Sequence, residues 1–190
     1  MKQMVIPAIS SYKRLEKFLE SEYELAVFLE VHISQLKNIT KMANRYHKKL
    51  IFHVDLIEGL KNDERGTEFL CQEYDPYGLI STKASVIQKA KQKGVLSIQR
   101  VFLLDSQALE QSYKLIEFTK PDYIEVLPGA MPWMIKEVKQ QTKTPILAGG
   151  LIRRTREVEQ AITAGATAVT TSKTKLWDVF EKEKNSFKIG

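Results

Sequence analysis

The sequence predicts an α/β protein built as one compact (β/α)8 barrel of the TIM type. Short apolar segments alternate with amphipathic segments of helical period along the whole chain, and eight such pairs can be counted. The strand segments are continuous apolar runs, which is typical of parallel strands buried on both faces. The rival fold with the same alternation is a doubly wound open sheet. No Gly-x-Gly-x-x-Gly follows the first strand, and this absence favours the barrel.

Length and composition are consistent with a single domain. The chain has 190 residues, and no linker or low-complexity segment divides it. We therefore expect one barrel domain over residues 1–190, with a charged C-terminal tail at about residues 181–190. Barrels of this class more often have ~250 residues, so the loops must be short.

The composition also bears on location and partners. One cysteine, Cys71, rules out an internal disulfide, and neither a signal peptide nor a membrane-length apolar run is present. We therefore expect a soluble cytoplasmic protein with no membrane partner. The formal net charge is +6 and the pI is about 9.2. This excess of positive charge modestly favours polyanions or phosphorylated ligands.

The first half of the chain supplies four strand-and-helix units. We expect strands at residues 5–9, 25–31, 50–56 and 78–81, each an apolar run. The helices that follow are expected to begin near Tyr12, near Leu36 or Thr40, at Thr67 and at Ser85. A turn-rich loop is expected at residues 62–66. Pro76 and Gly94 end the third and fourth helices.

The second half repeats this pattern four times. Strands are expected at residues 95–104, 123–127, 145–148 and 166–171. Asp105 or Ser106 caps the fifth helix, and Pro132 suits the first turn of the sixth. Thr155 is the expected N-cap of the seventh helix, which Gly165 ends. A final short helix is expected to begin at residues 176–180.

Two turns near the C-terminus form the most specific local signal. Gly149 and Gly150 follow the seventh strand, and Thr171 and Ser172 end the eighth. In barrels of this class the loops after the last two strands are where phosphate usually binds, held by backbone N–H groups. We predict a phosphate site at these four residues, although two ordinary tight turns would leave the same pattern.

Polar residues at the ends of otherwise apolar strands point to the same face. Burying them without partners costs free energy, and strand ends form the barrel mouth. The candidate ligand contacts are Asp55, Lys83, Arg100, Glu125 and Gly129, with Glu30 as a further charged residue. Asp55 and Glu125 are equally consistent with structural ion pairs to Lys83 and Arg100. His53, deeper in the third strand, is interpreted as a hydrogen-bonded core histidine.

The usual sequence signatures of metal sites and nucleophilic enzymes are absent. The three histidines are not spaced as His-x-x-x-His, there is no cysteine cluster, and no Gly-x-Ser-x-Gly elbow or P-loop occurs. We therefore predict no metal, no cofactor and no catalytic residue.

Basic residues also cluster outside the mouth. The candidates for contacts with RNA are Arg45, Lys48, Lys49, Arg153, Arg154 and Arg156. For any single cluster a solvated helix face is the simpler interpretation. Together they leave room for an RNA surface, although no RNA-recognition consensus is present.

Several segments, taken together and in order, resemble the glycerol-3-phosphate-responsive antiterminators of bacteria. They are VIPAI at the start, FHVDLIEGL at 52–60, GLISTK at 78–83, YIEVLPG at 123–129, ILAGGLI at 146–152 and AVTTSK at 168–173. The resemblance covers nearly the whole chain. It implies a regulator that senses glycerol 3-phosphate, binds the leader mRNA of glycerol-utilisation genes and prevents termination of transcription.

Two alternatives remain open at this stage. One is an isomerase, aldolase or synthase acting on a phosphorylated three-carbon substrate, with Glu125 or Asp55 as base and Lys83 as electrophile or Schiff-base lysine. The other is a metabolite-binding module whose partner is another protein. A homo-oligomer is also possible, because Trp133, Met134 and Trp177 are either exposed interface residues or core.

Overall fold

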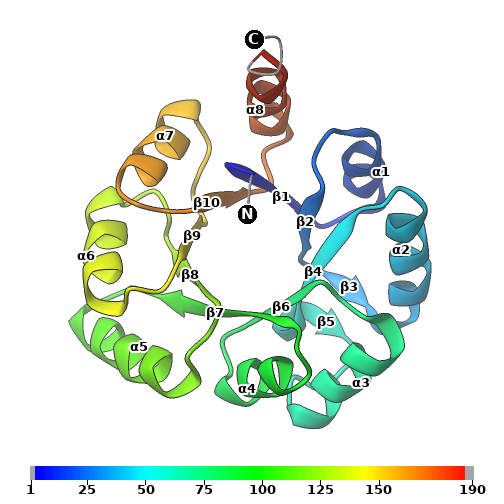
Figure 1. The fold of residues 1–190 in the computed structure, drawn as a ribbon, viewed down its shortest axis with the longest axis horizontal. Coiled ribbons are helices and arrows are strands. Elements are labelled where there is room, and N and C mark those ends of the chain that lie inside the picture. The colour runs from blue at the N-terminus through cyan, green and yellow to red at the C-terminus, as the bar shows by residue number, and fades with distance from the viewer. Residues whose placement is uncertain (1–2, 187–190) are drawn as a thin grey trace.

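The structure, a computed structural model, describes residues 3–186 and is a closed barrel of eight parallel strands (Figure 1). The strands are β1 (Val5–Ile9), β2 (Leu25–Phe28), β4 (Lys49–His53), β6 (Gly78–Ser81), β7 (Leu96–Phe102), β8 (Tyr123–Leu127), β9 (Ile146–Gly149) and β10 (Ala168–Thr171). They follow one another around the barrel in chain order, and β10 pairs with β1 to close it. The predicted (β/α)8 barrel is confirmed.

Among residues 3–186, eight α-helices surround the barrel, and Figure 1 shows them as an outer ring. They are α1 (Tyr12–Glu20), α2 (Ile33–Arg45), α3 (Glu64–Tyr74), α4 (Ala84–Gln92), α5 (Ser106–Thr119), α6 (Pro132–Thr142), α7 (Thr155–Thr163) and α8 (Thr174–Ser186). The side chains of Ser11, Asp63 and Asp105 cap their helices by accepting a hydrogen bond from a first-turn N–H. Because Asp63 caps α3, that helix begins at Glu64, inside the segment predicted as a loop.

Three strand predictions extended too far: β7 ends at Phe102 and not at residue 104, and the other two share one physical reason. β2 ends at Phe28 and β4 at His53, where a short 3-10 helix (Val54–Leu56) follows. The apolar pattern nevertheless continues, because β3 (Val31–His32) pairs with β5 (Ile57–Glu58) in a small separate sheet. Val31 and Ile57 are buried there, so their hydrophobicity reports a second structure and not a longer barrel strand.

Apolar side chains fill the lower part of the barrel interior. Those clustered there are Ile6, Leu25, Val27, Ile51, Ile80, Ile98, Leu147 and Ala168. A larger apolar cluster lies between the barrel and the helices. The interior positions nearer the carboxyl ends of the strands are polar. The barrel therefore has a polar layer at this end, its mouth, and a packed apolar layer beneath it.

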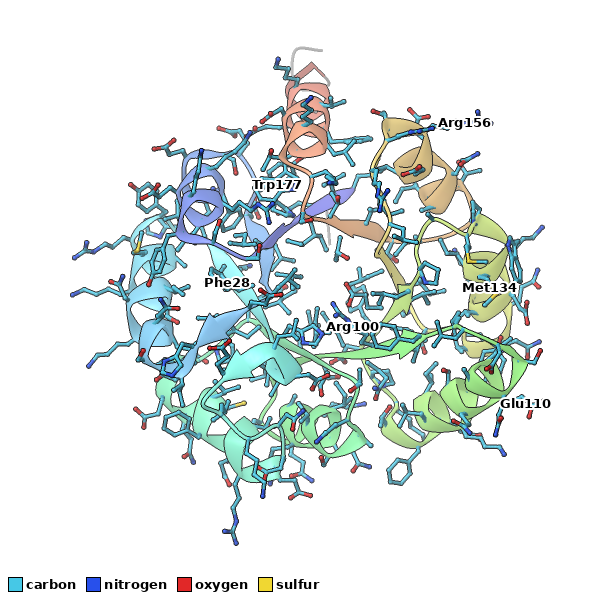
Figure 2. The ribbon with its side chains drawn as sticks, turned by 180° about the vertical axis from the view of Figure 1, so that it is seen from behind. Phe28, Arg100, Glu110, Met134, Arg156 and Trp177 are labelled. Carbon is cyan, nitrogen blue, oxygen red and sulfur yellow. The ribbon has the colours of Figure 1, made fainter. Side chains whose placement is uncertain are left out.

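The C-terminal helix is fastened by a tryptophan. Trp177 is buried where α8 meets the barrel (Figure 2), and its indole N–H donates to the carbonyl oxygen of Thr171 at 2.8 Å. The hydroxyl of Tyr23 donates to the carbonyl oxygen of Trp177 at 2.9 Å. Met134 is buried as well, whereas Trp133 is 59% exposed. Of the three predicted interface candidates, only Trp133 is on the surface.

α8 is longer than predicted and includes part of the expected tail. It continues to Ser186, and residues 187–190 lie outside the described residues. Within residues 3–186 no helix is both long enough and apolar enough to cross a membrane.

The two tryptophans provide a matched test of this packing. Trp177→Ala should lower the free energy of unfolding by about 3–5 kcal/mol, because it leaves a cavity and an unpaired carbonyl group. Trp133→Ala, at the exposed position, should change it by no more than about 0.5 kcal/mol. Urea unfolding measures both. Similar losses for the two variants would contradict the assignment.

Candidate ligand site at the barrel mouth

A buried carboxylate organises the polar layer above the apolar floor. Glu125, on β8, is 1% exposed. One of its oxygens accepts a hydrogen bond from Nε of Arg100 on β7 at 2.7 Å, and the other accepts from Oγ1 of Thr170 on β10 at 2.7 Å. Figure 2 shows Arg100 near the barrel axis. Of the two predicted ion pairs, the one between Arg100 and Glu125 is therefore present.

The Glu125–Thr170 contact passes across β9 and explains the glycine there. A Cβ atom at Gly149 would lie 2.6 Å from Thr170 Oγ1 and 2.9 Å from Glu125 Oε1. Any side chain would therefore separate the carboxylate from the hydroxyl. Gly149 is buried within β9 and does not line the neighbouring cavity, so its observed role is to allow this contact.

A cavity of about 370 Å³ opens above this network. Five predicted site residues line it: Arg100, Glu125, Gly150, Thr171 and Ser172. It is also lined by polar residues absent from the predicted site, Arg153, Thr170 and Lys173, and by apolar side chains from several strands. The volume lies in the range of small-molecule sites, about 300–1,000 Å³.

The two turns beside the cavity carry free backbone donors. Within residues 3–186, no protein acceptor is found for the N–H groups of Gly150, Leu151, Ile152 and Ser172. Gly150 and Leu151 both have positive φ, +74° and +59°. For leucine this conformation is uncommon and costs about 1–3 kcal/mol. Free N–H groups gathered in adjacent turns are the kind of group that binds an anion.

The start of α7 already holds a carboxylate. Glu157 accepts hydrogen bonds from the N–H groups of Arg153 at 2.6 Å and Arg154 at 3.0 Å. The Arg153 bond is the main reason that the pKa of Glu157 lies below its ordinary value. Arg154 is the N-cap and the predicted cap, Thr155, is the first helical residue. Any anion in the cavity would therefore bind to the turn amides and not to the end of this helix.

The charge around the cavity is positive. Three cationic side chains, Arg100, Arg153 and Lys173, line it against the single carboxylate of Glu125. In the part of the chain that the structure describes, the terminal guanidinium nitrogens of Arg100 have no hydrogen-bond acceptor. Cations without a full set of partners beside free amides favour an anionic ligand.

Asp55 and Lys83 form a separate polar group and do not line the cavity. Asp55 accepts from Ser81 Oγ at 2.5 Å and from Thr82 N and Oγ1 at 2.8 and 2.9 Å. Burial pushes the pKa of Asp55 up, but these hydrogen bonds outweigh burial and hold the pKa below its ordinary value. Lys83 is exposed and donates to Asn62 Oδ1 at 2.8 Å. The other predicted ion pair, Asp55 with Lys83, is not present.

Gly129 and Glu30 also lie away from the cavity. A Cβ atom at Gly129 would be 2.7 Å from the backbone nitrogen of Gly149, and its N–H donates to the Gly149 carbonyl oxygen at 2.5 Å. Gly129 therefore lets the β8–α6 loop pack directly on β9. Glu30 is exposed between β2 and β3.

His53 is buried beside the charged layer, as predicted, but it is not hydrogen-bonded as expected. Neither ring nitrogen has a partner among residues 3–186. Burial, and secondly the charge of Arg100, lower the pKa of His53 to about 4, although Glu125 and Asp55 act in the opposite direction. The imidazole is therefore neutral at neutral pH.

The residues predicted to contact RNA lie at opposite ends of the barrel. Arg153, Arg154 and Arg156 follow β9 at the mouth, and Figure 2 shows Arg156 at the periphery of the helix ring. Arg45, Lys48 and Lys49 lie at the amino end of β4. Because all barrel strands are parallel, these two ends are separated by the length of the strands.

A family model for glycerol-3-phosphate responsive antiterminators matches residues 5–177. The chain belongs to this family. A glycerol uptake operon antiterminator regulatory protein from Listeria monocytogenes has a similar structure, with a TM-score of 0.92 and 44% identity, covering 94% of this chain and 96% of that one. A glycerol uptake operon antiterminator-related protein from Thermotoga maritima has a TM-score of 0.83 and 26% identity, covering 94% and 99%.

A sequence relative is the Escherichia coli K12 protein YgcP, described as uncharacterized. It is 34% identical over 178 residues, which cover 94% of this chain and 93% of that protein. The predicted family resemblance is thus confirmed.

Sequence reasoning missed three polar residues that line the cavity, as well as its apolar lining. Lys173 directly follows the predicted Thr171–Ser172 turn, so its place in the chain was a usable signal. Thr170 can be identified as an interior residue only from the pairing register of β10 with β9. It lies two residues after Ala168, so both side chains point into the barrel. Arg153 was assigned to RNA and not to the cavity.

His53 makes stability depend on pH. The unfolded chain takes up a proton below pH 6.5, whereas the folded protein takes it up only near pH 4, so acid stabilises the unfolded state. From pH 7 to pH 4 this histidine should cost about 3 kcal/mol of unfolding free energy. His53→Asn should remove this part of the acid loss, measured by urea unfolding across that range. His47→Asn, at an exposed position, should retain it; an unchanged acid loss in His53→Asn would refute the assignment.

Proposed function

We propose that this protein is a glycerol-3-phosphate-sensing antiterminator that binds the leader mRNA of glycerol-utilisation genes in the cytoplasm and prevents termination. The observation that carries the proposal is the cavity at the mouth, where four free backbone N–H groups meet three cations. Family membership supports the choice of glycerol 3-phosphate among small phosphorylated ligands. The cavity volume, about 370 Å³, suits a three-carbon phosphate.

The proposed binding mode divides the ligand into two parts. The phosphate lies against the turns after β9 and β10, where the amides of Gly150, Leu151 and Ser172 donate to its oxygens. Arg153 and Lys173 neutralise its charge from the rim. The two hydroxyl groups lie deeper, where the Arg100 guanidinium can donate to them and the Glu125 carboxylate can accept from them.

We propose that the ligand controls affinity for RNA. Phosphate would hold the β9–α7 and β10–α8 turns in one conformation, and it would offset the cost of the left-handed Leu151 with new hydrogen bonds. A state that binds the ligand better and also binds RNA better couples the two. The coupling is reciprocal, so RNA must strengthen ligand binding by the same factor.

The enzyme alternative has weaker support. Lys83, its candidate Schiff-base lysine, is exposed, bonded to Asn62 and outside the cavity. Glu125 and Asp55, its candidate bases, each hold several hydrogen bonds as acceptors. Borohydride treatment in the presence of a triose phosphate is therefore expected to leave Lys83 unmodified.

The phosphate clamp is tested by removing one rim cation. Lys173→Ala should weaken binding of glycerol 3-phosphate roughly tenfold, the loss of one charge-assisted hydrogen bond. Lys175→Ala removes an exposed lysine two residues away that does not line the cavity, and it should bind as the wild type does. Isothermal titration calorimetry measures both. Equal affinities of the wild type and Lys173→Ala for glycerol 3-phosphate would show that Lys173 does not contact the ligand.

The ligand-to-RNA coupling has its own test. The affinity for glycerol 3-phosphate, measured by calorimetry with and without leader RNA, should differ by the same factor as the RNA affinity measured with and without ligand. A factor of roughly 5–150 is typical of such coupling. Identical ligand affinities in the presence and absence of RNA would contradict the sensor mechanism.

A further inference from the structure

Two adjoining hollows lie at the opposite end of the barrel from the ligand cavity. The larger, about 670 Å³, lies at the amino ends of β4, β6 and β7. The smaller, about 500 Å³, is a groove between α2 and α3. Both are lined by Thr40, Asn44 and Tyr74, so they form one continuous concave surface. We call it the lower surface.

A stripe of three cations runs along the groove. Lys37, Lys41 and Arg45 line it and are spaced four residues apart on α2, so they share one face of the helix. The carboxylate of Glu73 also lines the groove, but neither it nor any other carboxylate of residues 3–186 lies within salt-bridge distance of the three cations. Like charges at this spacing repel, at about 0.2–0.5 kcal/mol per pair. They lie about 6 Å apart along the axis, similar to the spacing of phosphates along a nucleic acid strand.

Aromatic rings lie in the larger hollow. Tyr77 is 43% exposed, and the ammonium of Lys49 is 4.9 Å from its ring centroid. Tyr74 is braced by an edge-to-face contact with Phe69, with ring centroids 5.8 Å apart. The ammonium lies over one face of the Tyr77 ring, so a base would stack on the other face, with the cation near its phosphate.

Two polar side chains at the junction of the hollows lack partners within residues 3–186. The Thr40 hydroxyl is buried with no hydrogen bond. The Asn44 amide is exposed and likewise makes no hydrogen bond within these residues. The exposed amide of Asn44 can both donate to and accept from a base edge.

The other lysines of the lower surface have internal roles. Lys48 donates to the carbonyl oxygens of Ser21 and Tyr23 at 2.5 and 2.6 Å. Lys91 donates to the Lys120 carbonyl oxygen, and Lys93 pairs with Glu68. The cations available to a partner are therefore those of the stripe, with Lys49 beside Tyr77.

We propose that the lower surface binds a single-stranded segment of the leader RNA. Consecutive phosphates follow Lys37, Lys41 and Arg45, and one unstacked base enters the larger hollow against Tyr77, where the exposed amide of Asn44 contacts its edge. This inference rests on the proposed function and names the surface by which it acts. A hollow of about 670 Å³ has room for a splayed base, whereas the bases of a duplex are stacked inside and cannot enter it.

The mouth arginines are the competing surface. Arg153 lines the ligand cavity, and Arg154 and Arg156 are exposed beside it. None of these three lines the two hollows of the lower surface or lies beside their aromatic rings. Ligand and RNA would then occupy opposite ends of the barrel, joined by strands such as β4, which begins at Lys49 and leads to His53.

The test compares two matched triple variants by fluorescence anisotropy with labelled leader RNA and saturating glycerol 3-phosphate. Lys37→Gln/Lys41→Gln/Arg45→Gln should weaken RNA binding at least tenfold. It should also reduce the slope of log affinity against log salt by about two, since each phosphate contact contributes about 0.7 for a single strand. Arg154→Gln/Arg156→Gln/Lys175→Gln loses the same charge at the mouth and should bind RNA within about twofold of the wild type.

A second pair of variants tests stacking. Tyr77→Ala should weaken RNA binding roughly 5- to 100-fold, whereas Tyr77→Phe should retain it, because base stacking needs only the ring. Ligand affinity in the absence of RNA, measured by calorimetry, should stay unchanged in all these variants and serves as the control for folding.

The outcomes separate the two proposals. Wild-type protein that binds no leader RNA at any ligand concentration overturns the proposed function. Wild-type binding that is retained in the α2 triple variant, or lost only in the mouth variant, overturns the lower surface and leaves the function intact. Competition by duplex RNA as strong as by single-stranded RNA also overturns the single-strand assignment.

Discussion

The buried carboxylate of Glu125 is the constraint on which the mouth of this barrel depends. An ionised carboxylate inside a protein must be paired and hydrogen-bonded, or its desolvation is not offset. Arg100 supplies one partner from the adjacent strand β7, and Thr170 supplies the other from β10, two strands away on the other side. Thr170 can do so only because Gly149 leaves the intervening strand without a side chain. Four neighbouring strands, β7 to β10, are therefore matched to one another through a single interaction.

That interaction also positions the candidate ligand site. With its Nε committed to Glu125, Arg100 keeps its remaining donors at the base of the cavity. The turns that follow β9 and β10 then place free amides above it. The Arg100–Glu125 ion pair therefore forms the base of the ligand cavity and is also part of the barrel interior. A change at Glu125 would consequently affect folding and ligand binding together, whereas changes at the rim affect binding alone.

The fold and the family were accessible from the sequence, and so was part of the site. Gly150, Thr171 and Ser172 line the cavity because turns after the last two barrel strands lie at the mouth in every such fold. Asp55 and Lys83 were placed there by the same rule, yet they face the β4–β6 side and bond to their neighbours. A strand-end position determines the face of the barrel but not which neighbour a side chain contacts.

The alternation of apolar strands with amphipathic helices follows from the residue pattern alone, because hydrophobic period and burial are local properties, and this alternation leads to a barrel. The role of Gly149 became clear from the folded chain, since the two side chains that meet across it are 24 and 21 residues away in the sequence. The fold also places Arg45 and Arg153 at opposite ends of the barrel, although each belongs to a basic cluster in the sequence. The sequence shows which residues are charged. The end of the barrel at which each one lies depends on how the parallel strands bring distant segments together.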